Sequence, residues 1–446
     1  MNVLDYAYYY FIGAGGIGMS ALERYFKSLE KVVLGYDKTP TELTLALEKE
    51  GIDISFDDQT DKVPNFLTPE NTLVIYTPAI PNDTVIYQYF VQKEFRMVKR
   101  SEVLGEITKS SYGIAVAGTH GKTTTSSILG HILHQADLES TAFLGGIIEN
   151  YNSNVLINGT KYTVSEADEF DRSFLRLSPK IGIITSMDAD HLDIYGNKEE
   201  FEQTFVEFSQ KITEKLFVRK GLPLENATTY GVESGAEIDA INIRIENGIY
   251  HFDVQTPEGL FRDFSLKLPG RHNVENATAA IAVSLYLGIP FETIQKALAE
   301  FLGVKRRFNR WDFNDKVYID DYAHHPTELN AVIRSIKDMF PGKKVLGVFQ
   351  PHLFTRTRDF MDGFVDSLSQ FDELILLDIY PARELPIEGV TSDSLLEKIN
   401  LEAKEVSSLQ EAMSKIKTKE FDVLVTVGAG NIDTLVQPIK TWLNEG

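Results

Sequence analysis

The sequence predicts an α/β protein of about three domains, and three observations lead to this fold class. The chain has 446 residues, which exceeds the roughly 250–300 residues that one hydrophobic core usually serves. Two glycine-rich turns, at 13–18 and 118–121, each follow a strand-like apolar run and precede a stretch with helical periodicity. The last third of the chain alternates strand-like and helix-like segments, as parallel sheets covered by helices do.

Composition narrows the class of protein further. With 43% hydrophobic and 24% charged residues, the composition predicts a globular rather than a disordered protein. Its net charge of −21 argues against nucleic acid or an anionic membrane as a partner. The absence of cysteine excludes disulfides, thiolate nucleophiles and cysteine–zinc sites. Since the start lacks a basic leader and no apolar run reaches about 18 residues, we expect a cytoplasmic protein.

The first glycine-rich turn joins a strand predicted over Tyr6–Ile12 to a helix predicted over Met19–Leu29. A second strand, Lys31–Tyr36, completes a βαβ unit, and Leu73–Tyr76 is a further strand candidate. Glycine allows the backbone to turn tightly and to approach a phosphate that rests on the helix N-terminal amides. The residues of this candidate substrate-binding turn are Gly13, Gly15, Gly16, Ile17 and Gly18.

Asp37 ends the second strand, nineteen residues after Gly18, where a ribose-binding acid is expected. The pattern does not identify the nucleotide, because NAD and a UDP-sugar could both use such a turn. A tight strand–helix connection without a ligand is the alternative.

The second glycine-rich turn lies between a strand at Tyr112–Ala117 and a helix at Ser126–Gln135. Its residues are Gly118, Thr119, His120, Gly121, Lys122, Thr123 and Thr124. Backbone amides of such a loop cradle phosphates, the lysine reaches the β- and γ-phosphates, and the hydroxyl of Thr123 binds Mg²⁺. The general pattern has glycine where this chain has Val116, so we interpret the segment as a variant P-loop.

Acidic residues and a histidine follow two nearby strands. Glu166 comes after Tyr162–Val164, and His191 follows the strand Ile181–Thr185. Strand carboxyl ends in α/β proteins meet at the ligand, so Thr123, Glu166 and His191 are the predicted metal ligands. Alternatively, Glu166 caps a helix and His191 is an ordinary loop residue.

The remaining segments complete the predicted domains. Residues Ala240–Lys267 alternate around Asn247-Gly248, a hairpin signal. The last third predicts strands at Val317–Ile319, Val345–Phe349, Glu373–Leu377 and Val423–Val427, with helices at Thr327–Met339, Asp359–Ser369 and Ser408–Ile416. We therefore expect domains at 1–107, 108–310 and 311–446.

Two polar clusters accompany the last domain. The basic run Lys305–Arg307 could clamp a phosphate at a domain junction or could be a solvated face. His352, Arg356 and Arg358 follow a predicted strand and could hold a carboxylate or a phosphate. Asp320–Pro326 follows another strand and is a further candidate; the alternative is that it only begins a helix.

Taken together, these motifs resemble the Mur ligases of peptidoglycan synthesis over nearly the whole chain. The matching segments are Gly13–Ser20 (UDP loop), Gly118–Thr124 (ATP loop), Ser165–Arg172 with Asp188–His191 (metal segments) and Gly270–Asn276 (adenine contact). Three further segments, Asp320–Glu328, Phe349–Thr357 and Val427–Ile432, are similar to the member that adds the first amino acid, L-alanine.

The resemblance implies an N-terminal Rossmann-like UDP-binding domain, a central P-loop ATPase-like domain with a mixed sheet and a C-terminal Rossmann-like domain. The implied ligands are UDP-N-acetylmuramate, L-alanine, ATP and Mg²⁺, and Mn²⁺ could take the place of Mg²⁺. The implied oligomeric state is a monomer or a weak homodimer. The implied reaction forms an acyl phosphate that the amino acid then attacks.

The resemblance also implies roles for individual residues. Lys122, His191 and Arg356 would be catalytic. ATP would contact the second turn (Gly118–Thr124) together with His272, Asn276, Arg307 and Asp320. The substrates other than ATP would contact the first turn and Asp37, together with Tyr322, His324, His352 and Arg356.

Two departures from the family pattern stand out. Other members carry a lysine that becomes carbamylated and holds Mg²⁺, but the stretch Thr204–Phe208 has none. The Gln-Pro-His segment is often followed by arginine, and here Leu353 follows it.

Four alternatives compete with this interpretation. A ligase that recycles a preformed tripeptide belongs to the same family, and a folylpolyglutamate synthase shares the last two domains. A nucleotide-sensing binding protein would have no turnover. An NAD-dependent dehydrogenase would explain the first turn but not the second.

Overall fold

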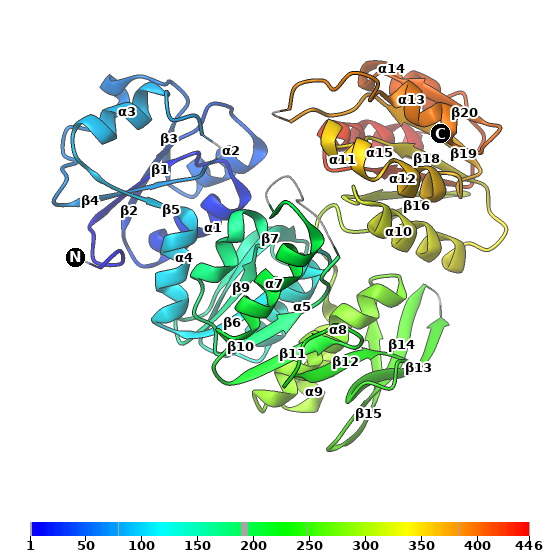
Figure 1. The fold of residues 1–446 in the computed structure, drawn as a ribbon, viewed down its shortest axis with the longest axis horizontal. Helices are drawn as coiled ribbons and strands as arrows, with labels where there is room; N and C mark the ends of the chain where they lie inside the picture. The colour runs from blue at the N-terminus through cyan, green and yellow to red at the C-terminus, as the bar shows by residue number, and fades with distance from the viewer. Residues whose placement is uncertain (1, 79, 189–194, 247, 383, 446) are drawn as a thin grey trace. The chain divides into compact units, whose positions relative to one another are not determined.

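A computed structural model of the chain describes residues 2–78, 80–188, 195–246, 248–382 and 384–445 (Figure 1). The chain forms two compact units, which are described separately. The first comprises Met1–Ile243, His251–Ser265 and Glu275–Leu302, and the second comprises Arg244–Tyr250, Leu266–Val274 and Gly303–Gly446. Three sheets, each with its own helices, give the three-domain α/β architecture that the sequence predicts.

The N-terminal sheet has the strand order β3-β2-β1-β4-β5, and its recorded pairs are parallel. Its elements are β1 (Tyr8–Ile12), α1 (Ile17–Ser28), β2 (Val32–Tyr36), α2 (Glu42–Lys49), β3 (Asp53–Ser55), η1 (Thr60–Lys62), β4 (Thr72–Tyr76), α3 (Val85–Gln92), β5 (Arg96–Lys99) and α4 (Arg100–Lys109). The aromatic and β-branched run of β1 is central and buried on both faces. The chain proceeds outward from β1 in both directions, so the turn after β1 lies at the switch point where α/β sheets bind ligands.

The central sheet has ten strands in the order β15-β14-β13-β12-β11-β10-β6-β9-β7-β8, and it is mixed because β7 and β8 pair antiparallel. Its strands are β6 (Tyr112–Ala117), β7 (Ser140–Ile148), β8 (Ser153–Ile157), β9 (Tyr162–Ala167), β10 (Ile181–Ile184), β11 (Lys215–Arg219), β12 (Thr228–Val232), β13 (Ile238–Glu246), β14 (Ile249–Thr256) and β15 (Gly259–Leu266). The helices are α5 (Lys122–Gln135), η2 (Phe170–Arg176), α7 (Lys198–Ser209), α8 (Arg271–Tyr286) and α9 (Phe291–Glu300). The alternating segment expected as a hairpin forms three neighbouring strands, β13 to β15; Asn247 lies outside the described residues.

The C-terminal sheet has the order β16-β17-β21-β18-β19-β20, with β16 antiparallel to β17 and the other pairs parallel. Its strands are β16 (Asn309–Phe313), β17 (Lys316–Asp321), β18 (Val345–Phe349), β19 (Glu373–Leu377), β20 (Lys404–Ser407) and β21 (Val423–Val427). The helices are α10 (Pro326–Met339), α11 (Phe354–Asp359), α12 (Met361–Leu368), α13 (Ser392–Lys398), α14 (Leu409–Ile416), η3 (Asn431–Leu435) and α15 (Val436–Glu445). The predicted boundary between 310 and 311 falls within β16, and the one between 107 and 108 falls within α4; the domain boundaries stay predictions.

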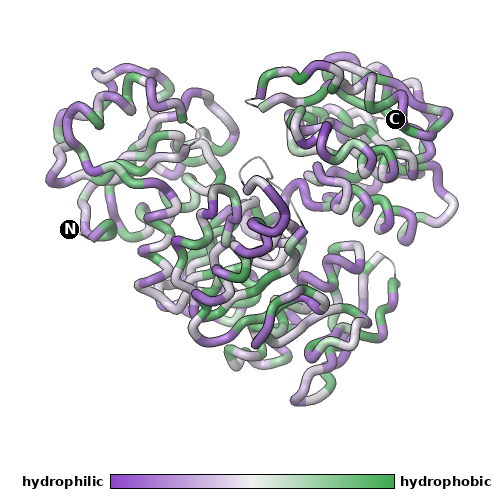
Figure 2. The backbone as a smooth tube through the Cα atoms, viewed as in Figure 1, coloured by the Kyte–Doolittle hydropathy of each residue, from purple (hydrophilic) through white to green (hydrophobic). Residues whose placement is uncertain are grey.

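Apolar side chains occupy the strands of all three sheets, and Figure 2 shows hydrophobic stretches along them. In the last sheet, two apolar clusters form: one includes Phe349 and Leu374, and the other includes Val348 and Ile375. Neighbouring residues of one strand point to opposite faces, so each cluster covers one face. No helix among the described residues is long and apolar enough to cross a membrane.

Candidate active site

The first glycine turn requires glycine at two positions. Gly13 has φ +93°, a left-handed conformation that side chains disfavour. A Cβ at Gly15 would lie 2.9 Å from Thr44 Cγ2 and 3.0 Å from Asp37 Oδ2. The Gly15 N–H donates to that same Asp37 oxygen at 2.7 Å. The turn therefore packs directly on the acid that the sequence predicts as a ribose ligand, and α1 begins after Gly16 without a side-chain cap.

The second glycine turn is held by the end of β10. A Cβ at Gly118 (φ +134°) would lie 2.1 Å from Thr185 Oγ1, so only glycine fits there. The His120 N–H donates to Ser186 Oγ at 2.7 Å, and Thr119 Oγ1 donates to the Asp188 carbonyl at 2.7 Å. The turn leads directly into α5, whose N-cap Gly121 has φ +83° and no side-chain cap. This is the strand–loop–helix arrangement that a phosphate-binding loop needs.

Lys122 pairs with Glu169, which lies in the segment Ser165–Arg172 but has no individual role among the sequence predictions. The ammonium donates to Glu169 Oε2 at 2.7 Å and Oε1 at 3.0 Å, and to the Gly118 carbonyl at 2.7 Å. Burial alone would lower the pKa of Lys122, but the carboxylates around it, Glu169 first, raise that pKa above its ordinary value. The pair is therefore ionic, although burial pushes the pKa of Glu169 upward.

Thr123 and Glu166 meet as predicted, with Thr123 Oγ1 donating to Glu166 Oε2 at 3.0 Å. Ser126 Oγ at 3.2 Å and the Gly145 N–H at 2.5 Å both bind Glu166 Oε1. A hydroxyl and a carboxylate side by side suit a hard divalent cation, which prefers oxygen ligands. Among the described residues no group of three or more metal-ligating His, Asp or Glu side chains occurs; the predicted third ligand, His191, lies outside the described residues.

The predicted adenosine-side residues are divided between the two units. In the first unit, Asn276 lies against the second turn, since Thr125 Oγ1 donates to its Oδ1 at 3.2 Å and a Cβ at Gly121 would lie 2.5 Å from that oxygen. His272 belongs to the second unit, where burial lowers its pKa to about 4.

Arg307 and Asp320 are also in the second unit, and within the described part of the chain no ion pair joins them. Asp320 accepts from Thr426 Oγ1 at 2.7 Å and lies 3.5 Å from Arg306 Nε. The guanidinium groups of Arg306 and Arg307 stack on the Tyr322 ring at 5.2 and 5.1 Å from its centroid. Within the basic run, Arg306 thus pairs with Asp320 on β17, and both Arg306 and Arg307 pack on the ring of Tyr322.

One cavity of the first unit, about 410 Å³ in volume, brings the two glycine turns together. The first turn contributes Gly16, Ile17 and Gly18, and the central domain contributes Lys122, Glu166 and Asp168. Arg100, at the start of α4, completes the polar lining; its guanidinium would lie 3.1 Å from a Cβ at Gly18. A larger hollow of about 600 Å³, lined by Arg96 and Arg176, contains none of the predicted site residues.

The predicted amino-acid residues gather in the second unit. The rings of His324 and His352 are 6.0 Å apart, and Tyr322 is 5.3 Å from His324. Arg356 Nη1 lies 3.4 Å from His352 Nδ1. Burial lowers the pKa of both histidines to about 4, so both are neutral near pH 7.

Two further residues adjoin these histidines. Glu328, which ends the predicted segment Asp320–Glu328, lies 3.3 Å from His324. Tyr380, which was not predicted, stacks on His352 with ring centroids 5.7 Å apart. Leu353, the departure from the family pattern, has φ +73°, which is strained for a residue with a side chain.

Three family models match the chain. They are the Mur ligase family catalytic domain over residues 8–112, the Mur ligase middle domain over 116–284 and the Mur ligase glutamate ligase domain over 306–430. The chain belongs to the Mur ligase family. Like the sequence resemblance, the models cover all three domains of this Mur ligase.

Two relatives at high identity are both named UDP-N-acetylmuramate–L-alanine ligase. This Mur ligase is 54% identical over 448 residues to the UDP-N-acetylmuramate–L-alanine ligase of Flavobacterium johnsoniae, with 100% of both chains covered. It is 45% identical to the enzyme of that name from Porphyromonas gingivalis, over 97% of this chain and 98% of the relative.

Solved structures agree on the fold. The UDP-N-acetylmuramate–alanine ligase of Thermotoga maritima matches with a TM-score of 0.83 at 27% identity, covering 98% of this chain and 99% of that one. A murein peptide ligase from Psychrobacter arcticus matches with a TM-score of 0.72 at 22% identity, over 99% of both chains. At this lower identity, the similarity to the Psychrobacter arcticus ligase shows only that the fold is shared.

Proposed function

We propose that this Mur ligase joins L-alanine to UDP-N-acetylmuramate, with conversion of ATP to ADP and phosphate, in the synthesis of peptidoglycan precursors. The observation that carries the proposal is the cavity in which the first glycine turn, Lys122 and Glu166 meet. A ligand held by its diphosphate on the first turn would extend its other end toward the lysine that contacts the γ-phosphate. The high identity to the Flavobacterium johnsoniae ligase supports the choice of acceptor and amino acid.

The reaction begins with attack of the acceptor carboxylate on the γ-phosphorus of ATP, which breaks the bond to ADP and leaves an acyl phosphate. Catalysis of such a transfer is mainly positioning and charge stabilisation. Lys122 and the amide groups of Gly118–Thr124 bind the phosphates, and Asn276 lies beside the same turn. Mg²⁺, or Mn²⁺ in its place, would be held by Thr123, Glu166 and His191, and when bound it neutralises the phosphate charge.

L-Alanine then attacks the acyl carbon through its amine, and inorganic phosphate leaves from the tetrahedral intermediate. Arg356 binds the alanine carboxylate, a pairing that suits a guanidinium. His324 and His352 are neutral near pH 7 because burial lowers their pKa to about 4. Neutral imidazoles can accept hydrogen bonds from the amine without repelling it, and Tyr322 borders the same pocket.

Further assignments follow from this function. Residues 1–107 bind UDP-N-acetylmuramate through the first turn and Asp37, residues 108–310 bind ATP, and residues 311–446 bind the amino acid and close on ATP through Arg307 and Asp320. His272 contacts the adenine side. The enzyme works in the cytoplasm as a monomer or weak homodimer.

Phosphate release tests the proposal. Purified protein with ATP and Mg²⁺ is supplied with UDP-N-acetylmuramate and each of the twenty amino acids in turn. We expect release only when both the acceptor and L-alanine are present, with glycine and L-serine as the nearest competitors. Release that requires a preformed tripeptide would indicate the recycling ligase instead, and tight binding of NAD with no binding of UDP-sugar would overturn the assignment of the first domain.

A further inference from the structure

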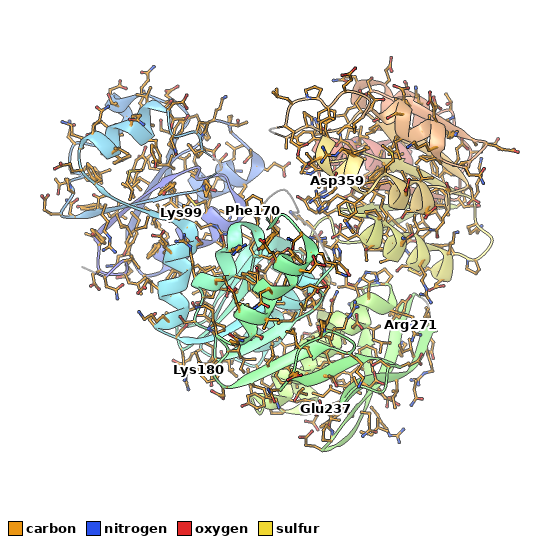
Figure 3. All side chains as sticks on the ribbon, in the orientation of Figure 1. Lys99, Phe170, Lys180, Glu237, Arg271 and Asp359 are labelled. Atoms are coloured by element: carbon orange, nitrogen blue, oxygen red, sulfur yellow. The ribbon has the colours of Figure 1, made fainter. Side chains whose placement is uncertain are left out.

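A buried acidic residue that contacts Lys122 has no part in the mechanism described above. Glu169 lies between β9 and η2, beside Phe170, which Figure 3 labels. Its side chain is only 2% exposed. Its backbone carbonyl accepts hydrogen bonds from the Tyr195 hydroxyl and, at 2.9 Å, from the Arg172 N–H. The backbone that carries this carboxylate is therefore held from two sides.

The three N–H bonds of the Lys122 ammonium match three acceptors. Two are the oxygens of Glu169, at 2.7 and 3.0 Å, and the third is the Gly118 carbonyl at 2.7 Å. In this arrangement the lysine folds back over its own loop. A phosphate oxygen can gain a hydrogen bond from Lys122 only if one of these three acceptors gives up its own.

The acceptor that gives way is the Gly118 carbonyl. A buried carboxylate that loses the cation paired with it is costly, because its charge is then left uncompensated. A carbonyl at the mouth of a loop loses much less. Lys122 therefore keeps Glu169 while it binds phosphate, and the carboxylate stays close to the incoming anion.

We propose that Glu169 is a positioning residue for Lys122: its carboxylate holds the ammonium where the migrating phosphoryl group needs it, at the expense of ATP affinity. The reasoning rests on the proposed function, in which Lys122 contacts the phosphates of ATP. A fixed ammonium stabilises charge in the transition state without reorganising. The nearby negative charge, in contrast, repels the triphosphate in the ground state.

Glu169→Gln separates these two effects. The amide has nearly the same size, but it removes the charge and presents one oxygen instead of two. We expect ATP to bind more tightly, with Kd and KM for ATP lower by about threefold or more. We also expect kcat to fall by about tenfold or more, since the ammonium is no longer held. A role in folding alone would not lower the KM for ATP while it lowers kcat.

Glu373→Gln is the matched control. Glu373 is also a mostly buried glutamate, 11% exposed, and it pairs with Lys344 and Lys419 in the second unit, outside the candidate site. Any loss of stability from removing a lysine-paired glutamate should appear in both variants. The opposed changes in KM and kcat should appear only in Glu169→Gln.

A double-mutant cycle completes the test. If Glu169 acts through Lys122, then Glu169→Gln should lower kcat in the wild-type protein but not in Lys122→Ala. An equal fold-loss of kcat in both backgrounds would overturn the proposal, as would an unchanged ATP affinity in Glu169→Gln. Direct calorimetric titration of ATP separates this result from a failure of ATP binding itself, in which the wild-type protein would bind no ATP. A different acceptor or amino acid in the phosphate-release assay would change the proposed function but leave this test of Glu169 valid.

Discussion

The two glycine turns of this chain look alike in sequence but build their anion sites differently. The first relies on the backbone, and one of its amides, the Gly15 N–H, is already bonded to Asp37. The second adds a charged side chain, Lys122, and is braced by hydroxyl groups from the end of β10. We infer from this difference that a glycine pattern determines where a phosphate can bind. The neighbouring side chains determine how strongly the phosphate binds and whether it reacts.

The largest effect should come from the side chain that only the second turn has. Lys122→Ala is expected to lower kcat by about 10²–10³-fold, the loss seen when one stabilising donor is removed. The variant also leaves Glu169 buried without its cation, so thermal stability should fall as well. Steady-state kinetics and thermal melts measure the two effects. Unchanged turnover would show that the second turn is structural. The two turns would then not differ in their use of a charged side chain.

The next effect tests the backbone character of the first turn. Gly15→Val places side-chain atoms where Thr44 and Asp37 already lie, and it blocks the approach of a pyrophosphate. We expect UDP-N-acetylmuramate to bind about tenfold more weakly or worse, a loss of about 1.4 kcal/mol or more. ATP affinity of the same variant, measured by calorimetry, should be unchanged. A parallel loss of ATP affinity would mean that the two turns do not bind separate ligands.

A third variant probes the acid beside the second turn. Gly145→Ala would bring a Cβ to within 2.6 Å of Glu166 Oε2 and so displace the predicted metal ligand. We expect the Mg²⁺ concentration for half-maximal activity to rise by about 10-fold or more, as for other residues that orient metal ligands. The KM for ATP at saturating metal should change less.

Gly130→Ala is the control for this metal effect. A Cβ at Gly130, on α5, would lie 2.8 Å from Ala142 Cβ on β7, which is an apolar partner. Its stability should fall while its metal requirement stays the same. An equal shift in metal requirement for both variants would assign the effect to packing.

The smallest expected effect is a change in the pH dependence of stability, and it comes from the histidine pocket, which has no glycine turn. This pocket depends on buried side chains that titrate. Burial lowers the pKa of His352 to about 4, below the ordinary value near 6.5. As pH falls from about 6.5 to 4 the unfolded chain takes up a proton first, so the free energy of unfolding decreases in that window.

His352→Asn removes this titrating group. Its unfolding free energy should therefore fall less between pH 6.5 and 4 than that of the wild-type protein, by about 1–2 kcal/mol. Chemical denaturation at several pH values measures the difference. Identical pH dependence in both proteins would show that His352 does not titrate differently in the folded and unfolded states.

Local patterns in the sequence were enough to predict both turns. Glycines between a buried strand and a helix constrain only a few neighbouring residues, and the structure shows β1, α1 and β6 close to where the patterns place them. The predicted start of the next helix at Ser126 was wrong, because α5 begins at Lys122, directly after Gly121. The meeting of Thr123 with Glu166 was also predicted, because parallel strands end at one edge of a sheet.

Features that depend on distant packing were not predicted. Glu169 follows β9, the strand that contains Glu166, but nothing in the sequence indicates that its carboxylate turns toward Lys122, 47 positions earlier. Arg100 joins the cavity because α4 packs near the first turn. The strand β16 alternates exposed and half-buried residues and is an edge strand, so its pairing with β17 decided its structure more than its composition did.

The bond between Asp37 and the first turn bears on product inhibition. Each turnover releases inorganic phosphate, a small anion that a bare backbone turn would also attract. At the first turn this anion would meet the Asp37 carboxylate, which already uses the Gly15 N–H and repels a second negative group. A nucleotide escapes this penalty, because its ribose hydroxyls can donate to the same carboxylate. We therefore expect accumulating phosphate to compete with ATP at the second turn rather than with the UDP-sugar at the first.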